Sequence, residues 1–83
     1  MDFVKIVKSE IKNINKSQDR NGTWEVTCDV VDTLEDGTVV PGDAYIGYGM
    51  TMQQAENLRV RCVTAPNPDA YIRAIWKNQQ SEL

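Results

Sequence analysis

Carboxylates are the most concentrated chemical groups in this chain, and they gather in its middle. Residues 21–50 contain no lysine or arginine but six acids, namely Glu25, Asp29, Asp32, Glu35, Asp36 and Asp43. Paired carboxylates hydrolyse glycosides when they lie about 5–9.5 Å apart, and acid-rich loops bind Ca²⁺ when their oxygens recur at fixed positions. The stretch DVVDTLEDG lacks that order of ligands, and its spacing forces no two carboxylates together. We therefore predict a solvated acidic face.

Histidine is absent from the sequence. Its absence removes histidine-based acid–base catalysis, histidine-activated nucleophiles and histidine metal sites. The two cysteines, Cys28 and Cys62, make no structural zinc site. The N-terminal stretch MDFVKIVKSE has no apolar signal-peptide core, so we predict reduced thiols in the core rather than a disulfide. We also predict no enzymatic activity, no cofactor and no bound metal.

Two central segments alternate between apolar and polar residues, as half-buried strands do. In TWEVTCDVV, one side carries Trp24, Val26, Cys28 and Val30. In DAYIGYGM, one side carries Ala44, Ile46, Tyr48 and Met50. We predict that these two sets share one face of a sheet, with Trp24 and Tyr48 in the core.

The turn between these strands determines which side chains share a face. A strict two-residue hairpin at Asp36-Gly37 would pair Cys28 with Tyr45, and so turn the apolar face of one strand toward the glycine face of the next. Two devices correct this register. One is a bulge at Pro41-Gly42, and the other is a three-residue loop, Glu35-Asp36-Gly37, with Gly37 in a left-handed conformation.

Residues 3–16 are consistent with either a helix or a strand. Their apolar residues occupy one arc of a helical wheel, but most are β-branched, and the segment contains neither alanine nor leucine. A two-stranded hairpin alone is marginal in water and is stabilised by a third strand. We predict a strand.

Two helices are predicted after Met50. Thr51 and Gln54 fit a capping box, and the helix that follows would place Met52, Ala55, Leu58 and Cys62 inward. Alternation over residues 58–64 leaves a strand there as an alternative. Pro66 ends this element, and Asn67-Pro68-Asp69 is typical of a helix start. The second helix, over 68–79, is predicted to bury Tyr71, Ile72, Ile75 and part of Trp76.

Together these elements predict an α+β fold in a single domain, residues 1–83: a small antiparallel meander of three strands, or four, with two C-terminal helices packed on one face. The chain has 83 residues, of which 41% are hydrophobic, and such a chain buries only a modest core. No apolar run approaches the roughly 20 residues of a membrane span. We expect a soluble protein in the cytoplasm, or in the virion if a bacteriophage encodes it.

The distribution of charge is the most unusual feature of the sequence. The central segment carries −6, and since the whole chain carries −3, the two flanking segments together carry +3. We predict a non-enzymatic interaction or assembly protein whose partner is another copy of itself or another protein. The predicted contact surface comprises Glu25, Asp29, Asp43, Tyr45, Lys5, Lys8, Arg59 and Arg61.

An alternative function uses only the basic segments. Lys5, Lys8, Lys12 and Lys16 would line one stripe if their segment were helical, and such a stripe suits nucleic acid or an anionic partner. A small nucleic-acid-associated or inhibitory accessory protein, of the kind that bacteriophages encode, is therefore the second hypothesis. The net negative charge makes nucleic acid the less favoured partner, because binding it requires cations that displace phosphate counterions.

Overall fold

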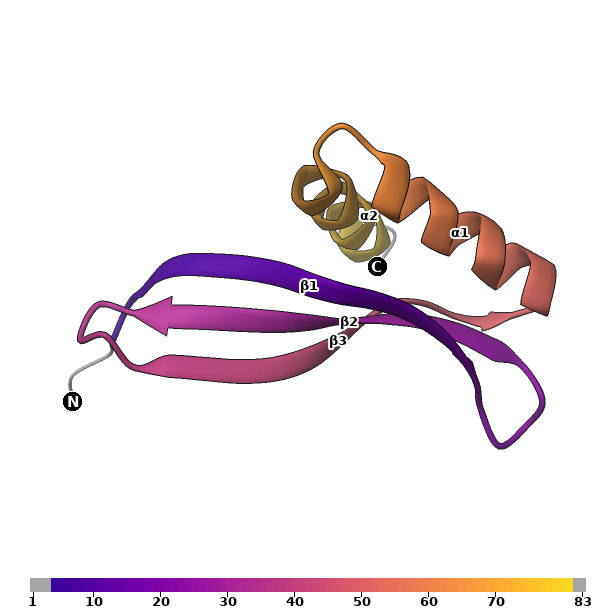
Figure 1. Ribbon diagram of the computed structural model, residues 1–83, viewed down its shortest axis with the longest axis horizontal. Helices are drawn as coiled ribbons and strands as arrows, with labels where there is room; N and C mark the ends of the chain where they lie inside the picture. The colour runs from indigo at the N-terminus through magenta and orange to yellow at the C-terminus, as the bar shows by residue number, and fades with distance from the viewer. Residues whose placement is uncertain (1–3, 82–83) are drawn as a thin grey trace.

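The computed structural model describes residues 4–81 and has an α+β fold, as predicted (Figure 1). Three antiparallel strands form one sheet in the order β1-β2-β3, and two helices follow. The strands are β1 (Ile6–Gln18), β2 (Trp24–Leu34) and β3 (Val39–Met50), and the helices are α1 (Met52–Thr64) and α2 (Pro68–Ser81). The N-terminal segment is thus a strand, and residues 58–64 are helical; residue 3 lies outside the described residues.

The hairpin between β2 and β3 turns through a three-residue loop, which resolves the register question. The Leu34 N–H donates to the Thr38 carbonyl over 2.8 Å, and Gly37 has a left-handed φ of 88°. Cys28 consequently pairs with Ala44, and the pairing runs through Pro41 and Gly42 without a shift. The three-residue loop therefore corrects the register, and there is no bulge at Pro41-Gly42.

A different irregularity overturns one core prediction. The register shifts once between Thr27 and Val26 and again before Trp24, so that β3 has extra residues near Ile46 and Gly49. An extra residue reverses which side chains face inward. Tyr48, predicted to lie in the core, is therefore 76% exposed. Gly47 takes the inward position instead, where a Cβ would lie 2.9 Å from the Leu58 side chain.

The core lies between the sheet and the helices. Its fully buried residues are Val26, Cys28, Ile46, Ala55, Cys62 and Ile72, and Ile11 and Ile14 of β1 pack against them. Both cysteines are buried and free, as predicted, and burial raises the pKa of each thiol above its ordinary value. Such thiols are poor nucleophiles because little thiolate forms.

Local capping chemistry fixes where both helices begin. The Gln54 N–H donates to Thr51 Oγ1, and the Thr51 N–H donates to Gln54 Oε1, which completes the predicted capping box. The Ala70 N–H donates to Asn67 Oδ1 at the start of α2. Met52, predicted inward, is 49% exposed because it occupies the first position of α1, where the helix begins at the end of the sheet.

The helices cover only part of the sheet, so the molecule is elongated. Its extents are 44 × 31 × 27 Å, and its radius of gyration of 14.4 Å exceeds the roughly 12 Å of a compact domain this long. The strands continue past α2 toward the loop at Gly37 (Figure 1). We call this uncovered part, residues 4–8 and 31–41, the arm. Among residues 4–81, no helix is long and apolar enough to cross a membrane.

Candidate interaction surface

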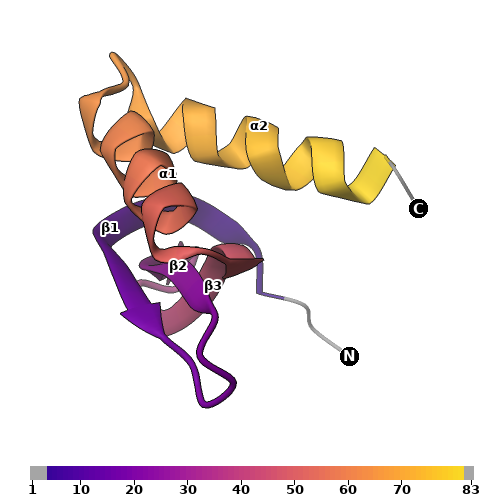
Figure 2. The same cartoon turned by 90° about the vertical axis from the view of Figure 1, so that its right-hand side faces the viewer.

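The sheet has one face without helices, which we call the outer face (Figure 2). Val26 and Cys28 are buried on the opposite, inner face, so their neighbours Glu25, Thr27 and Asp29 point outward. Register extends this assignment across the sheet. Lys12 of β1 pairs with Asp29, and Asp29 pairs with Asp43 of β3, so these three residues form one transverse row on the outer face.

Aromatic and apolar side chains lie on the outer face beside this row. Tyr45 pairs with Thr27 and is 59% exposed, and its ring meets that of Tyr48 edge-on with centroids 6.3 Å apart. Val39 and Pro41 continue the same side of β3 into the arm, and both are exposed. Tyrosines combine a large apolar body with a polar tip, which suits them to contact surfaces.

Charge is unevenly distributed across the outer face. Asp29 and Asp43 lie directly opposite one another, a like-charge pairing that destabilises a sheet. One device relieves Asp29: Asn13, in a left-handed bulge conformation with φ of 55°, donates from Nδ2 to Asp29 Oδ2 over 2.7 Å. Asp43 receives no hydrogen bond or ion pair from the described residues 4–81. Asn13 is uncharged, so Asp29 on β2 and Asp43 on β3 both keep their negative charge, and these two strands carry an excess of acids on the outer face.

The β1 side of the outer face carries the cations. Lys8 Nζ lies 2.7 Å from one Glu10 carboxylate oxygen, and Lys12 Nζ lies 3.3 Å from the other. Hydrogen bonds from these two lysines lower the pKa of Glu10. Two lysines against one acid leave β1 basic here, so the outer face has a basic margin on β1, formed by Lys8 and Lys12, and an acidic margin on β3, formed by Asp43.

The structure brings together five of the eight residues predicted for the contact surface. Glu25, Asp29, Asp43, Tyr45 and Lys8 all belong to the outer face. Lys5 is exposed at the start of the arm, where its carbonyl accepts from the Glu35 N–H over 2.9 Å. Arg59 and Arg61 belong to α1, in the other layer, where Arg59 pairs with Glu56.

Sequence reasoning missed Tyr48, Lys12 and the apolar strip of Val39 and Pro41. Lys12 was recognised only as a member of a helical stripe, whereas strand pairing sets it beside Asp29. Tyr48 was missed because a bulge reversed its direction. The two glycines that flank Tyr48 were the available signal, since glycine inside a strand often marks a bulge.

No family model matches the sequence, and neither a curated protein nor a solved structure shows significant similarity to it. Within residues 4–81, no group of three or more potential ligand residues is placed to hold a metal ion.

Proposed function

We propose that the protein is a non-enzymatic assembly protein that associates with a second copy of itself through the outer face. The observation that carries this proposal is the division of that uncovered face into a basic margin on β1 and an acidic margin on β3. Surfaces with separated charges of opposite sign are self-complementary under a suitable two-fold rotation.

The charge pattern selects one arrangement of the two copies. A two-fold axis parallel to the strands, lying between two outer faces, sets β1 of one copy against β3 of the other and keeps each transverse row in register. Lys12 of each copy then meets Asp43 of the other. An axis perpendicular to the strands would instead set β1 against β1 and oppose like charges.

The size of the outer face agrees with a weak to moderate association. Three strands at about 4.8 Å spacing and 11 residues at about 3.3 Å each give a footprint of about 500 Å² per copy. The pair would bury about 1,000 Å² in total, the lower bound for a specific interface. Exposed ion pairs contribute about 0.2–1 kcal/mol each, so they set the register while Tyr45, Tyr48 and Pro41 supply apolar area.

A charge exchange tests this arrangement. Lys12→Glu and Asp43→Lys, each alone, oppose like charges across the interface and are expected to weaken the dimer in sedimentation velocity at low salt. The double variant restores the pair with reversed sign and is expected to restore the dimer. A wild-type chain that stays monomeric at high concentration in low salt would contradict the proposal.

The nucleic-acid alternative gains no comparable support. On a strand, the lysines do not line one stripe: Lys8 and Lys12 lie on the outer face, each paired with Glu10. Lys16 lies on the inner face, where it pairs with Glu56 and sits 5.8 Å from the Trp24 ring centroid.

A further inference from the structure

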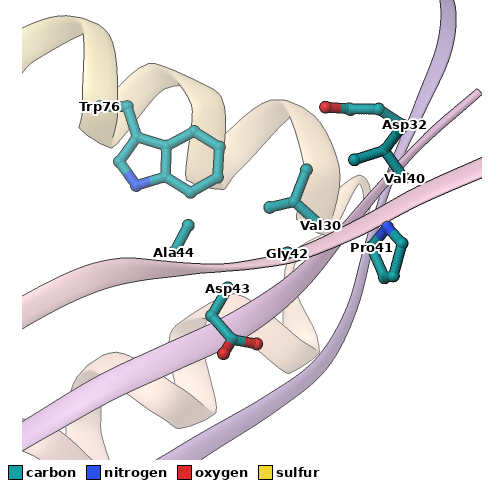
Figure 3. Close-up of a pocket in the computed structure, with 8 residues that line it drawn as sticks. All are labelled: Val30, Asp32, Val40, Pro41, Gly42, Asp43, Ala44 and Trp76. Atoms are coloured by element: carbon teal, nitrogen blue, oxygen red, sulfur yellow. The ribbon is translucent and has the colours of Figure 1, made fainter. Parts of the chain in front are cut away.

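A hollow on the inner face separates α2 from the arm (Figure 3). It is shallow and open to solvent, has a volume of about 350 Å³, and is lined by Val30, Asp32, Val40, Pro41, Gly42, Asp43, Ala44 and Trp76. Figure 3 shows Trp76 and the Asp32 carboxylate on one side of the strands and the Asp43 carboxylate on the other. The hollow opens on the inner face, opposite the outer face, and shares with the outer face only the rim residues Pro41 and Asp43.

The floor of the hollow is open because of Gly42. A Cβ added to Gly42 would meet nothing closer than the Val30 carbonyl oxygen at 3.9 Å. Val30, Val40 and Ala44 supply apolar surface around it. The hollow can therefore accept the apolar stem of a side chain from another molecule.

The walls supply an aromatic ring and a negative charge. Trp76 is held in place because its indole N–H donates to the Tyr45 carbonyl over 2.8 Å. Asp32 makes no hydrogen bond or ion pair within the described residues. The pKa of Arg73 is raised mainly by its hydrogen bond to Asp69, and the negative charge of Asp32 adds to this effect; the Arg73 guanidinium is bound by Asp69 and Ser9. An aromatic face beside a carboxylate suits a cationic group.

The free edge of β3 runs beside the hollow. Leu34 of β2 and Thr38 are a hydrogen-bonded pair. In an antiparallel ladder such pairs alternate with non-hydrogen-bonded pairs, in which the N–H and C=O groups of each strand point away from the other strand. Residues 39, 41 and 43 thus present N–H and C=O groups at the edge, except that Pro41 has no N–H. Beyond them, Trp76 and Gln79 bind the carbonyls of Tyr45 and Ile46, so α2 closes the edge there.

We propose that residues 39–43 of β3 and the adjoining hollow bind an extended segment of another protein, with a lysine or arginine side chain seated against Trp76 and Asp32. The segment adds a strand to the edge, and alternate side chains point to the inner face. The apolar stem of the basic side chain packs over Gly42, and its charged end lies at the wall formed by the indole and the carboxylate.

The test uses an acetylated, amidated peptide, TVTKTVT, and the same peptide with norleucine in place of lysine. Nuclear magnetic resonance follows the Gly42 amide and the Trp76 indole N–H during titration into the full chain. We expect saturable shifts of both signals, with the lysine peptide bound about fivefold more tightly than the norleucine peptide. Asp32→Asn is expected to remove this preference, whereas the same charge change in the hairpin loop, Glu35→Gln, leaves it intact.

Gly42→Leu tests whether the peptide occupies the hollow, because leucine fills the hollow without changing any charge. Gly42 has no positive φ, so leucine fits the strand and fills the hollow. We expect an unchanged folded spectrum and no binding of either peptide. Three results would overturn the proposal: no saturable shift in the wild-type chain, equal binding of the two peptides, or shifts of the Trp76 indole N–H that depend on protein concentration without peptide and persist in Lys12→Glu, where the outer-face dimer is weakened. The last would assign the hollow to a second copy. Lys12→Glu weakens the outer-face dimer without changing a residue of the hollow and is expected to leave peptide binding unchanged, so the two proposals fail separately.

Discussion

At the scale of single residues, backbone conformation decides the register of the β2–β3 hairpin. Gly37 holds a φ of 88°, which side chains with a Cβ rarely adopt. Asp36 supports the turn by accepting the Thr38 N–H at Oδ1 over 2.9 Å, and this hydrogen bond lowers the pKa of Asp36. The loop therefore places Cys28 opposite Ala44, and everything on the inner face follows from that pairing.

Gly37→Val tests this turn. The new Cβ would meet nothing within 4 Å, so the cost is backbone strain alone, which we expect to lower the free energy of unfolding by about 1–2 kcal/mol. Gly42→Val is the matched control, because residue 42 lies in a strand without a positive φ. Urea denaturation of both variants measures the difference. Equal stability of the two variants would show that the strain at Gly37 is absent.

At the scale of elements, the sequence predicted what short-range chemistry controls and missed what strand pairing controls. Thr51 with Gln54, and Asn67 before Pro68, fix helix starts through bonds within three residues, and both caps were predictable. The shift beside Ile46 depends on how β3 meets β2, and alternation along one strand cannot reveal it. Tyr48 was therefore assigned to the wrong face, and half of the aromatic surface was missed with it.

An ion-pair cluster links helix α1 to β1, and the contribution of this cluster to the free energy of unfolding should depend on pH. Hydrogen bonds from Arg59 and, to a smaller extent, from Lys16 lower the pKa of Glu56 from 4.5 to about 2. A carboxylate with a depressed pKa in the folded state stabilises the fold above the ordinary pKa of the unfolded chain, and this stabilisation is lost as pH falls through the folded value. The stabilisation by Glu56 is therefore lost as the pH falls from 4.5 to about 2.

Glu56→Gln is expected to be less stable than the wild-type chain at pH 6 and to approach it as pH falls from 5 to 2. Urea denaturation at a series of pH values measures the gap between the two proteins. Lys16→Met, introduced into the wild-type chain and into Glu56→Gln, serves as the control. Because Lys16 and Glu56 interact, Lys16→Met should lower the free energy of unfolding less in Glu56→Gln than in the wild-type chain. A gap that stays constant with pH would show that Glu56 carries no depressed pKa.

At the scale of the whole molecule, the two faces of the sheet differ in what they expose. The inner face is covered by helices except along the arm, where Ile6 and Val40 remain 58% and 45% exposed. The outer face has no cover at all within the described residues. A chain of this size gains little stability from its own core, so association that covers the outer face would add to the stability of the folded state.

Tyr45 and Tyr48 allow that contribution to be measured. Neither ring belongs to the core, so replacing both with threonine, which suits a strand, should lower the melting temperature only by the loss of their edge-on contact in solutions dilute enough to dissociate the proposed dimer. If two folded copies associate and unfolded chains do not, the melting temperature of the wild-type chain rises with protein concentration by mass action. The double variant loses most of the apolar contact and should melt at one temperature over the same range. Calorimetry from about 10 µM to 1 mM compares the two, since an interface near the lower size bound is expected to bind in the micromolar range. A wild-type melting temperature that does not depend on protein concentration would show that the outer face does not mediate self-association. Tyr45 and Tyr48 would then be expected to contact a different protein.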